Sequence, residues 1–444
     1  MSANNDAPSA SLDVAIIGGG IIGLMLAFGL LRHDIRVTVY ERSNDTTEIG
    51  AGFAFTGIAR ECMQQLDPRV LEALQRVGDL PRHSDNRYWD GFNPISKEAA
   101  QAEDALLFQM PAQQLDYMSC LRPHLLSELI ERLPKGVMRY GKQLKSYVDD
   151  ETSSKVTLSF TDGSAAEADA IIGCDGIRSR TRQLLLGEDN PASYASYTHK
   201  VSYRAVVPIA GAIAALGDDK ANNQCAHMGP NAHAVSYPVN DWKQFNMVVF
   251  LHDPEPWVDA DKMTVPATRQ EIQHALADWS PAIRELVDLL PNHLTKWGIF
   301  DMADNPAPTY ARGRVCIAGD AAHASCPFHG VGACMGVEDA LAIATSLEMV
   351  NAGVRNGSVP STLNAITSAL QAFNIVRLER SRWMTQNLRE MGDIYEWRHA
   401  STGRDAKKCE AEFERRSEMA WNFDIDNMVA ETKSECGRLL NITL

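Results

Sequence analysis

Residues 14–31 read VAIIGGGIIGLMLAFGLL and carry no charged or polar side chain. Such a run is about long enough to cross a membrane as a helix, and Gly19 and Gly23 make the GxxxG spacing of packed membrane helices. The flank argues against that interpretation, because residues 1–13 hold two Asp and no Lys or Arg, whereas a signal anchor carries positive charge there. Three consecutive glycines also cost about 1 kcal/mol each inside a helix. They therefore indicate a turn.

With a turn at residues 18–20, the run divides into elements of a βαβ unit. Residues 13–17 (DVAII) form a short buried strand, residues 21–32 an apolar helix, and residues 36–41 (RVTVYE) a second strand rich in β-branched side chains. The order strand, glycine turn, helix and strand predicts a dinucleotide-binding fold.

Gly18, Gly20 and Gly23 fit the GxGxxG fingerprint within this unit. The first glycine allows the tight turn, the second lets a pyrophosphate approach the backbone, and the third lets helix and strand pack closely. The helix N-terminus presents unpaired N–H groups and positive dipole to phosphate. Glu41 closes the second strand at the spacing expected for a carboxylate that accepts from a ribose hydroxyl.

The composition of the whole chain sets limits on its function. The chain has 444 residues, 45% hydrophobic and 22% charged, which is typical of a soluble globular protein with two or three domains. The net charge of −15 disfavours nucleic acid as a partner. Nine cysteines without a secretory signal indicate reduced thiols and a cytoplasmic location. Cys316, Cys326 and Cys334 lack the CxxC spacing of zinc sites, so we expect no metal.

Strand and helix patterns alternate along the rest of the chain. Residues 200–208, 233–240 and 245–253 have strand-like patterns and predict a mostly antiparallel sheet. Residues 360–444 have helical patterns, and within them the charged run 405–418 predicts a solvated helix face.

Two further turns combine glycine with an acidic residue. Asp175 and Gly176 close a buried strand, and Ser179 and Arg182 follow at DGxxSxxR spacing. Gly319 and Asp320 close another strand and lead into a glycine run at residues 330–336. That second turn predicts a cradle in which Asp320 accepts from sugar-chain hydroxyls and backbone N–H groups meet negative charge.

The order and spacing of the three motifs, over residues 12–395, resemble the single-component FAD-dependent aromatic hydroxylases, the class A flavoprotein monooxygenases. Within that class the chain is similar to the salicylate-hydroxylase-like branch, and in particular to fungal enzymes that hydroxylate, and sometimes dearomatise, resorcinol-type polyketides. The segments that carry this likeness are EIGAGFAFTGIA (48–59), YRAVVP (203–208), GPNAHAVSYPV (229–239), WGIFDM (297–302) and PFHGVGACMGVEDA (327–340). Many salicylate hydroxylases have Gln where this chain has His329, and Gly or Asn near Cys334, which weakens salicylate as the substrate.

The resemblance implies an α/β fold with a Rossmann-like FAD-binding domain, a mostly antiparallel substrate domain and C-terminal helices. We expect FAD-binding parts at residues 12–190, with a substrate-side insertion at about 80–120, and at 301–360. The substrate-binding sheet is expected at 191–300 and the C-terminal helices at 361–444.

The resemblance also implies non-covalent FAD, with NADPH or NADH as a transient electron donor. Arg122 would contact the ribityl–phosphate region, Asp175 would shape the approach of both cofactors, and the turn at 330–334 would face the pyrimidine ring of the flavin. The predicted cofactor-binding residues are Gly18, Gly20, Gly23, Glu41, Arg42, Gly52, Arg122, Asp175, Asp320, Gly330, Gly332, Ala333 and Cys334.

Arg204, Tyr237 and His329 are the predicted catalytic residues. Arg204 lies in an apolar strand pattern, where a buried charge needs a partner, although an edge-strand arginine facing solvent would show the same pattern. Tyr237 either contacts the substrate or only packs within the sheet. The resemblance favours a substrate contact for both Arg204 and Tyr237. His329, like His323, is either catalytic or a loop histidine that packs against flavin or backbone.

These residues predict an NAD(P)H- and O₂-dependent monooxygenase that hydroxylates a small phenol through a C4a-hydroperoxyflavin, with or without dearomatisation. Arg204 would lower the pKa of the phenol, and Tyr237 would orient its oxygen. The alternatives are decarboxylative hydroxylation of a salicylate and an FAD oxidoreductase that inserts no oxygen. We expect a monomer or homodimer without stable membrane insertion.

Overall fold

The glycine run at residues 18–20 is a turn between a strand and a helix, as predicted. The structure, a computed structural model, describes residues 11–44, 52–79, 86–110, 117–239, 242–259, 262–359 and 361–441. Strand β1 (Asp13–Ile17), helix α1 (Ile21–Arg32) and strand β2 (Arg36–Tyr40) form the βαβ unit. No helix among the described residues is long and apolar enough to span a membrane.

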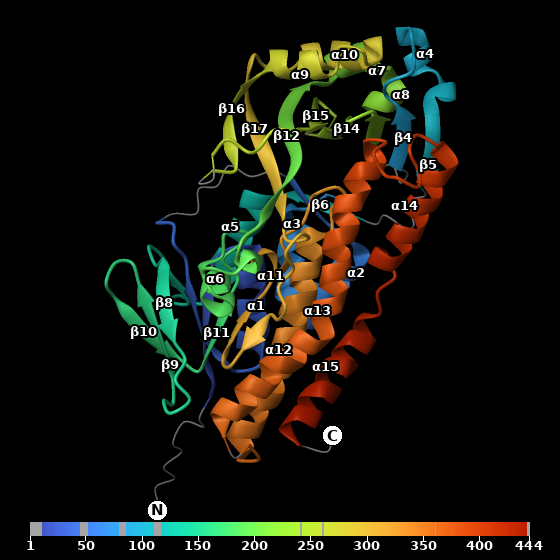
Figure 1. Cartoon of the computed structure of the whole chain (residues 1–444). Coiled ribbons are helices and arrows are strands. Elements are labelled where there is room, and N and C mark those ends of the chain that lie inside the picture. The colour runs from blue at the N-terminus through green and yellow to red at the C-terminus, as the bar shows by residue number, and fades with distance from the viewer. Residues whose placement is uncertain are drawn as a thin grey trace, which may run out of the picture.

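Six strands of the described residues form a first sheet around this unit (Figure 1). In order across the sheet they are β18 (Ala311–Arg312), β19 (Val315–Ile317), β11 (Ala170–Gly173), β1, β2 and β7 (Met138–Arg139). Strand β1 pairs in parallel with β2 and β11, and β11 pairs in parallel with β19. The three motif turns follow β1, β11 and β19, so they meet at one edge of the sheet, where ligands of open α/β folds bind.

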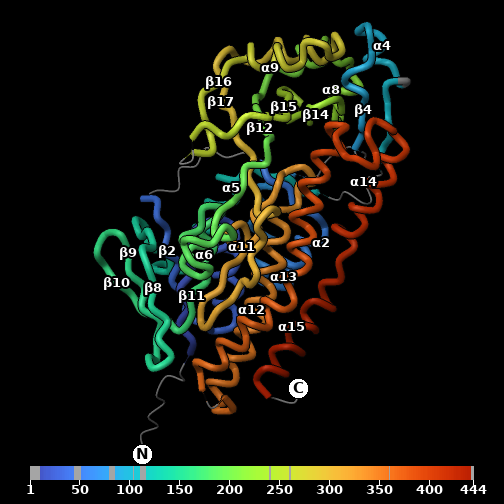
Figure 2. Tube along the Cα trace, in the orientation of Figure 1, coloured from blue at the N-terminus to red at the C-terminus, as the bar shows by residue number. Residues whose placement is uncertain are grey.

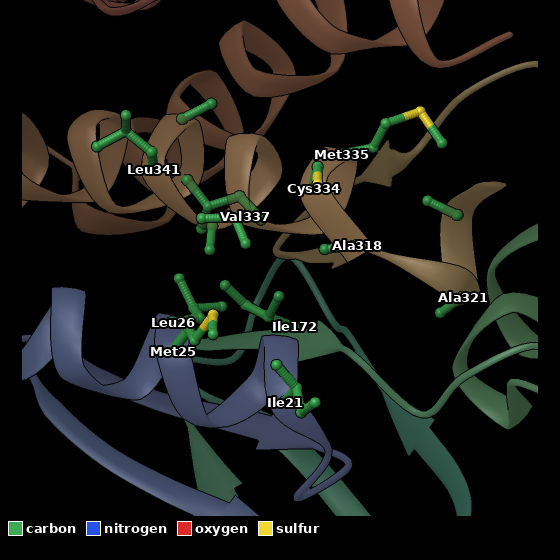
Figure 3. Packing of buried hydrophobic residues seen from close by; sticks show 14 of the residues in the cluster. Ile21, Met25, Leu26, Ile172, Ala318, Ala321, Cys334, Met335, Val337 and Leu341 are labelled. Atoms are coloured by element: carbon green, nitrogen blue, oxygen red, sulfur yellow. The ribbon is translucent and has the colours of Figure 1, made fainter. Parts of the chain in front are cut away.

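Further helices cover the apolar side chains of α1 on the side that faces away from the first sheet. Helix α12 (Gly332–Asn356) packs on α1, and α13 (Thr362–Tyr395) and α15 (Ile425–Leu440) pack on α12. Figure 3 shows Met25 and Leu26 of α1 facing Val337 of α12, with Ile172 of β11 beside them. Residues 14–31 are therefore hydrophobic throughout because β1 and α1 are buried between the sheet and the other helices.

A second sheet of eight strands, counted over the described residues, contains the predicted antiparallel segments (Figures 1 and 2). Its order is β16 (Thr264–Thr268), β17 (His293–Asp301), β12 (Ser196–Pro208), β15 (Gln244–His252), β14 (Ala232–Val239), β13 (Cys225–Gly229), β4 (Asn86–Asp90) and β5 (Leu106–Met110). All neighbours pair antiparallel except β13 and β4, which are parallel. The α/β class with an antiparallel second sheet and C-terminal helices is thus confirmed.

The two faces of the second sheet have different neighbours. Side chains such as Tyr203, Met247 and Val249 point to an outer core that is covered by α7 (Ile209–Leu216), α9 (Arg269–Ala275) and α10 (Pro281–Asp288). The alternate side chains, among them Val235 and Val248, pack against the main core that includes the first sheet. We call this second side the inner face.

Smaller elements complete the chain. They are β3 (Gly52–Phe55), α2 (Gly57–Leu66), α3 (Pro68–Val77), α4 (Lys97–Gln101), β6 (Met118–Leu121), α5 (Arg122–Arg132), β8 (Leu144–Val148), β9 (Val156–Phe160), β10 (Ala165–Ala168), α6 (Arg180–Leu186), α8 (Asp218–Ala221), α11 (Asp320–His323) and α14 (Ala406–Trp421). Strands β8, β9 and β10 form a separate antiparallel sheet.

The charged run at residues 405–418 is not simply a solvated helix face. It lies in α14, where Phe413, Arg416 and Ser417 are buried. Arg416 forms ion pairs with Glu390 and Glu412. Lys407, Lys408, Glu414 and Arg415 are exposed as predicted. Arg416 departs from the prediction, because a buried arginine with carboxylate partners cannot be told from an exposed one by charge pattern alone.

Candidate functional site

The glycines of the first motif occupy positions that exclude other residues for different reasons. Gly18 has φ of +106°, and a Cβ there would lie 2.3 Å from the carbonyl oxygen of Cys174. A Cβ on Gly23 would lie 2.1 Å from the carbonyl oxygen of Gly18. A Cβ on Gly20, by contrast, would meet no protein atom within 4 Å. Gly20 therefore faces open space at the N-terminus of α1, the place that the fingerprint reserves for a pyrophosphate.

Glu41 joins the end of β2 to this glycine turn. Its carboxylate accepts from the N–H of Gly19 at 2.7 Å and from the N–H of Ser43 at 2.8 Å. A carboxylate has further lone pairs for a ribose hydroxyl. The neighbouring Arg42 is exposed, so nothing in its position distinguishes it as a cofactor contact.

Arg122 lies between the first and third motifs. It is the first residue of α5 and is half-buried. Burial lowers the pKa of Arg122, while the charges of Asp320 and Glu41 oppose that change. The Asp320 side chain is accessible to solvent, yet it lies deep enough that burial raises its pKa against the charges of His323 and Arg122. An arginine between two acids at the sheet edge suits a ligand that carries both phosphate and hydroxyl groups.

The second motif holds the third in place. Asp175 accepts from the Ser179 hydroxyl and from both the N–H and the hydroxyl of Thr181, so its contacts lie within its own turn. Ser179 caps α6 by accepting from the N–H of Arg182 at 2.8 Å. Arg182 is fully buried and donates to the carbonyls of Ala321 and Ala322, directly after Asp320. The DGxxSxxR residues thus position the third turn.

The start of α12 supplies N–H groups at the same edge. Gly330 has φ of +68°, and α12 begins at Gly332. The first N–H groups of a helix have no intrahelical partner, and the dipole of a long helix favours negative charge there. Gly332 and Ala333 are half-exposed. Cys334, labelled in Figure 3, is buried beside the Thr56 hydroxyl, 3.9 Å from its sulfur.

A buried charge network behind these turns was not predicted. Asp339 of α12 accepts from the N–H of Gly319 at 2.9 Å, lies 2.6 Å from Nε2 of His323, and pairs with Arg377. Arg377 also pairs with Glu338. Although burial alone would raise the pKa of Asp339, His323 and Arg377 hold it below its usual value. Two consecutive acids inside an apolar helix were the sequence signal for this network.

Arg204 and Tyr237 lie together on the inner face of the second sheet. In the register of the sheet, Arg204 of β12 is paired with Val248 of β15, and Val248 is paired with Val235 of β14. Tyr237 lies two residues after Val235 on β14. The guanidinium of Arg204 lies 5.6 Å from the centre of the Trp297 ring, and its Nε is buried without a hydrogen-bond partner. Burial raises the pKa of Tyr237, and the charge of Arg204 opposes this.

Gly52 connects this face to the cofactor turns. It begins β3, and a Cβ on Gly52 would lie 3.6 Å from the Tyr237 hydroxyl oxygen. Gly52 is also paired with Leu121, the residue before Arg122, so β3 and β6 link the Tyr237 hydroxyl to the motif edge.

His329 is held by packing on the C-terminal helices. Its Nε2 lies 3.1 Å from the Ser417 hydroxyl, and its ring centre lies 4.7 Å from that of Trp421. Its carbonyl accepts from the Tyr117 hydroxyl at 2.9 Å. Burial, with the charge of Arg416, lowers the pKa of His329 to about 3. The ring is therefore neutral near pH 7, and a catalytic role for it stays a prediction.

Comparisons with known proteins agree with this geometry. A family described as "FAD binding domain" matches residues 11–366. An "FAD-dependent monooxygenase" of Aspergillus terreus is 55% identical over 97% of this chain and 98% of its own length. "Salicylate hydroxylase asL1" of Sarocladium schorii is 41% identical over 96% of this chain and 92% of its own length.

A solved structure, "Salicylate hydroxylase substrate complex", has 28% identity and a TM-score of 0.81, covering 95% of this chain and 98% of its own. The chain belongs to the FAD-dependent monooxygenases that share this FAD binding domain. The predicted family, enzyme class and FAD binding are thereby confirmed.

Proposed function

We propose that the chain hydroxylates a small phenol, taking electrons from NADPH or NADH and one oxygen atom from O₂. The observation that carries this proposal is the position of Arg204 and Tyr237 on the inner face. Among the residues that the structure describes, no carboxylate forms an ion pair with Arg204. A half-buried cation without an anion is costly, and an ionised phenol would supply the missing charge.

A phenolate between Arg204 and Tyr237 would also be activated for the reaction. Positive charge stabilises the ionised form of a phenol and lowers its pKa. The phenolate is the better nucleophile, because it makes the ortho and para carbons electron-rich. Tyr237 donates to the same oxygen and fixes the orientation of the ring. Hydroxylation at a carbon whose substituent is not lost leaves a ring that is no longer aromatic.

The residues at the motif edge fit FAD, which supplies the redox chemistry when bound. Gly20 faces open space at the sheet edge, Glu41 and Asp320 are close enough to act on the charge of Arg122, and the start of α12 adds N–H groups. We propose that FAD is held without a covalent bond, so acid precipitation should release it into the supernatant. Each hydroxylation consumes one NAD(P)H, one O₂ and one proton and releases one water.

The substrates that we propose are resorcinol-type phenols such as polyketides. Decarboxylative hydroxylation of a salicylate is the second candidate, because one relative and one structural neighbour are named salicylate hydroxylases. Release of CO₂ with the hydroxylated product separates the two reactions. An FAD oxidoreductase that inserts no oxygen would give no oxygenated product.

The test replaces Arg204 with Leu and with Lys in the FAD-loaded protein. Coupled hydroxylation should fall by about 10²-fold or more in Arg204→Leu, the scale of losing one preorganised electrostatic contact. FAD content should stay near that of the unmodified protein, and the remaining NAD(P)H consumption should yield peroxide. Raising the pH should partly restore the rate, because bulk base then supplies the phenolate. The rate of coupled hydroxylation in Arg204→Lys should lie between the rates of Arg204→Leu and the unmodified protein.

Full coupled activity in Arg204→Leu would contradict the assignment. Loss of FAD in that variant would instead assign Arg204 a structural role. Product mass and peroxide yield are measured together, so that uncoupled oxidation is not mistaken for hydroxylation.

A further inference from the structure

Asn246 is a further polar residue on the inner face, next to Tyr237. It lies in β15, where its Cα is paired with Tyr237 of β14 on one side and with Val206 of β12 on the other. Directly paired residues of antiparallel strands have their side chains on the same face, about 4.5–5.5 Å apart at Cβ. Because Val206 is two residues from Arg204, Asn246 shares the face of both Arg204 and Tyr237.

The amide of Asn246 has unused hydrogen-bonding capacity. Its Nδ2 is buried and has no hydrogen-bond partner in the described part of the chain. Two of its neighbours on the same face, Val206 and Val248, are apolar and cannot bond to it. Asn351 shows the usual arrangement: its Oδ1 accepts from the N–H of Leu12 and its Nδ2 donates to the carbonyl of His33. A buried donor without a partner is unfavourable, so its presence beside Arg204 and Tyr237 indicates a ligand atom.

We infer that Asn246 selects phenols with a carbonyl group ortho to the ionised hydroxyl, by donating a hydrogen bond from Nδ2 to the carbonyl oxygen. This inference rests on the proposed function, since it takes the phenolate to lie between Arg204 and Tyr237. An ortho carbonyl places its oxygen beside the phenolate oxygen, on the same edge of the ring. Asn246, the direct cross-strand neighbour of Tyr237, is the side chain that meets that second oxygen.

The charges on the inner face favour a neutral acceptor over a carboxylate. Lys200, further along β12, is buried in ion pairs with Glu396 and Asp393. Arg204 is left to balance one negative charge, which the phenolate already supplies. A carboxylate ortho to that phenolate would add a second negative charge against a neutral amide. An aldehyde or ketone oxygen accepts the hydrogen bond without that penalty.

A second contact also determines which carbon reacts. One held oxygen lets the ring rotate about the bond to that oxygen, whereas two held oxygens fix its orientation in the plane. Asn246 is therefore a specificity-determining residue, with consequences for product distribution as well as affinity.

The test combines one substitution in the protein with one change in the ligand. The ligands are a dihydroxyacetophenone and the matching ethylresorcinol, which has a methylene group in place of the carbonyl. Dissociation constants are measured on the oxidised FAD-loaded protein from the change in flavin absorbance, before any nicotinamide is added. The unmodified protein should bind the ketone about 10- to 100-fold more tightly, the range for a satisfied buried hydrogen bond. Asn246→Leu should reduce this preference by about 10-fold and leave ethylresorcinol binding within about 3-fold. The greater acidity of the acylated phenol accounts for the preference that remains.

Two further variants keep the result decisive. Asn246→Asp preserves the size of the side chain and should disfavour the ketone more than Asn246→Leu does, because a carboxylate repels the carbonyl oxygen. Asn427→Leu is the matched control, since Asn427 is exposed on α15 and donates to Glu431; it should keep the full preference. Turnover should show a mixed product distribution in Asn246→Leu.

An unchanged ketone preference in Asn246→Leu, or equal weakening of both ligands, would overturn the role of Asn246 but not the proposed function. If the unmodified protein hydroxylates neither phenol, the proposed function itself is wrong.

Discussion

The network behind the cofactor turns and the inner face of the second sheet differ in how their charged groups are paired, although Nδ1 of His323 in the network is also buried without a hydrogen-bond partner in the described part of the chain. Asp339 is bonded to Gly319, His323 and Arg377 at once, and Arg377 is shared with Glu338. On the inner face, Arg204 Nε and Asn246 Nδ2 are buried without hydrogen-bond partners in the described part of the chain.

This difference separates residues that maintain shape from residues that await a ligand. Charges that are paired with one another and with a backbone N–H fix one arrangement of the backbone, here the turn at Gly319. Unsatisfied donors cost about 1–3 kcal/mol each and are expected where a ligand completes the bonding. Substitutions in the two regions should therefore affect different measurements.

The largest effect on stability is expected from Arg377→Leu. It would leave Glu338 and Asp339 buried without this partner, and breaking a buried pair in this way costs about 3–5 kcal/mol of the free energy of unfolding. Denaturant unfolding of the FAD-loaded protein measures the loss. Arg355→Leu is the control, because its pair with Asp34 is exposed and should contribute at most about 1 kcal/mol. Equal losses in the two variants would contradict the structural role of the network.

A smaller effect, on cofactor affinity, is expected from Gly20→Ala. Gly20 has φ of −72°, which alanine adopts readily, and its Cβ would meet no protein atom. The FAD-free protein should therefore keep its stability within about 1 kcal/mol. FAD should bind about 10- to 100-fold more weakly, because overpacking against the pyrophosphate costs about 1–3 kcal/mol.

Gly23→Ala provides the contrast, since its Cβ would collide with the carbonyl of Gly18 and should destabilise the FAD-free protein too. Unchanged FAD affinity in Gly20→Ala would show that no phosphate approaches this turn.

The smallest effect is the contribution of His329 to pH dependence. Its pKa is lowered to about 3 in the fold from about 6.5 in the unfolded chain. Below pH 6.5 the unfolded chain therefore binds a proton that the fold excludes, and stability falls as the pH falls. Between pH 7 and pH 6 this amounts to under about 1 kcal/mol. His329→Gln should flatten the stability profile by that amount; an identical profile would mean that the pKa of His329 is the same in the fold as in the unfolded chain.

The elements of the first sheet were predictable from sequence because local signals coincide there. Gly18 is required locally by its φ of +106°, and Gly23 is required by its close approach to the carbonyl of Gly18, so the motif spacing carries the same information. The turns at Asp175 and Asp320 were found in the same way. The network of Asp339 and Arg377 was missed because its members come from three helices that meet only in the fold.

The candidate substrate site was only partly predictable. Arg204 and Tyr237 were singled out because a charge in an apolar strand and a tyrosine in the neighbouring strand pattern attract notice. Asn246 gave no such signal: its importance follows from the register that places it between Val206 and Tyr237. The burial of Arg416 and Ser417 likewise depends on how α14 packs, which charge pattern does not reveal.

The most direct test of the account is the pKa of a phenol bound to the protein. A dihydroxyacetophenone is titrated on the oxidised FAD-loaded protein, and its ionisation is followed by ultraviolet difference absorbance, with Arg204→Leu measured in parallel. The account predicts that binding lowers the pKa of the phenol by about 1–3 units, as an adjacent cation does, and that the shift is lost in Arg204→Leu. An equal pKa for the phenol bound to the two proteins would contradict the claim that the inner face binds a phenolate through Arg204.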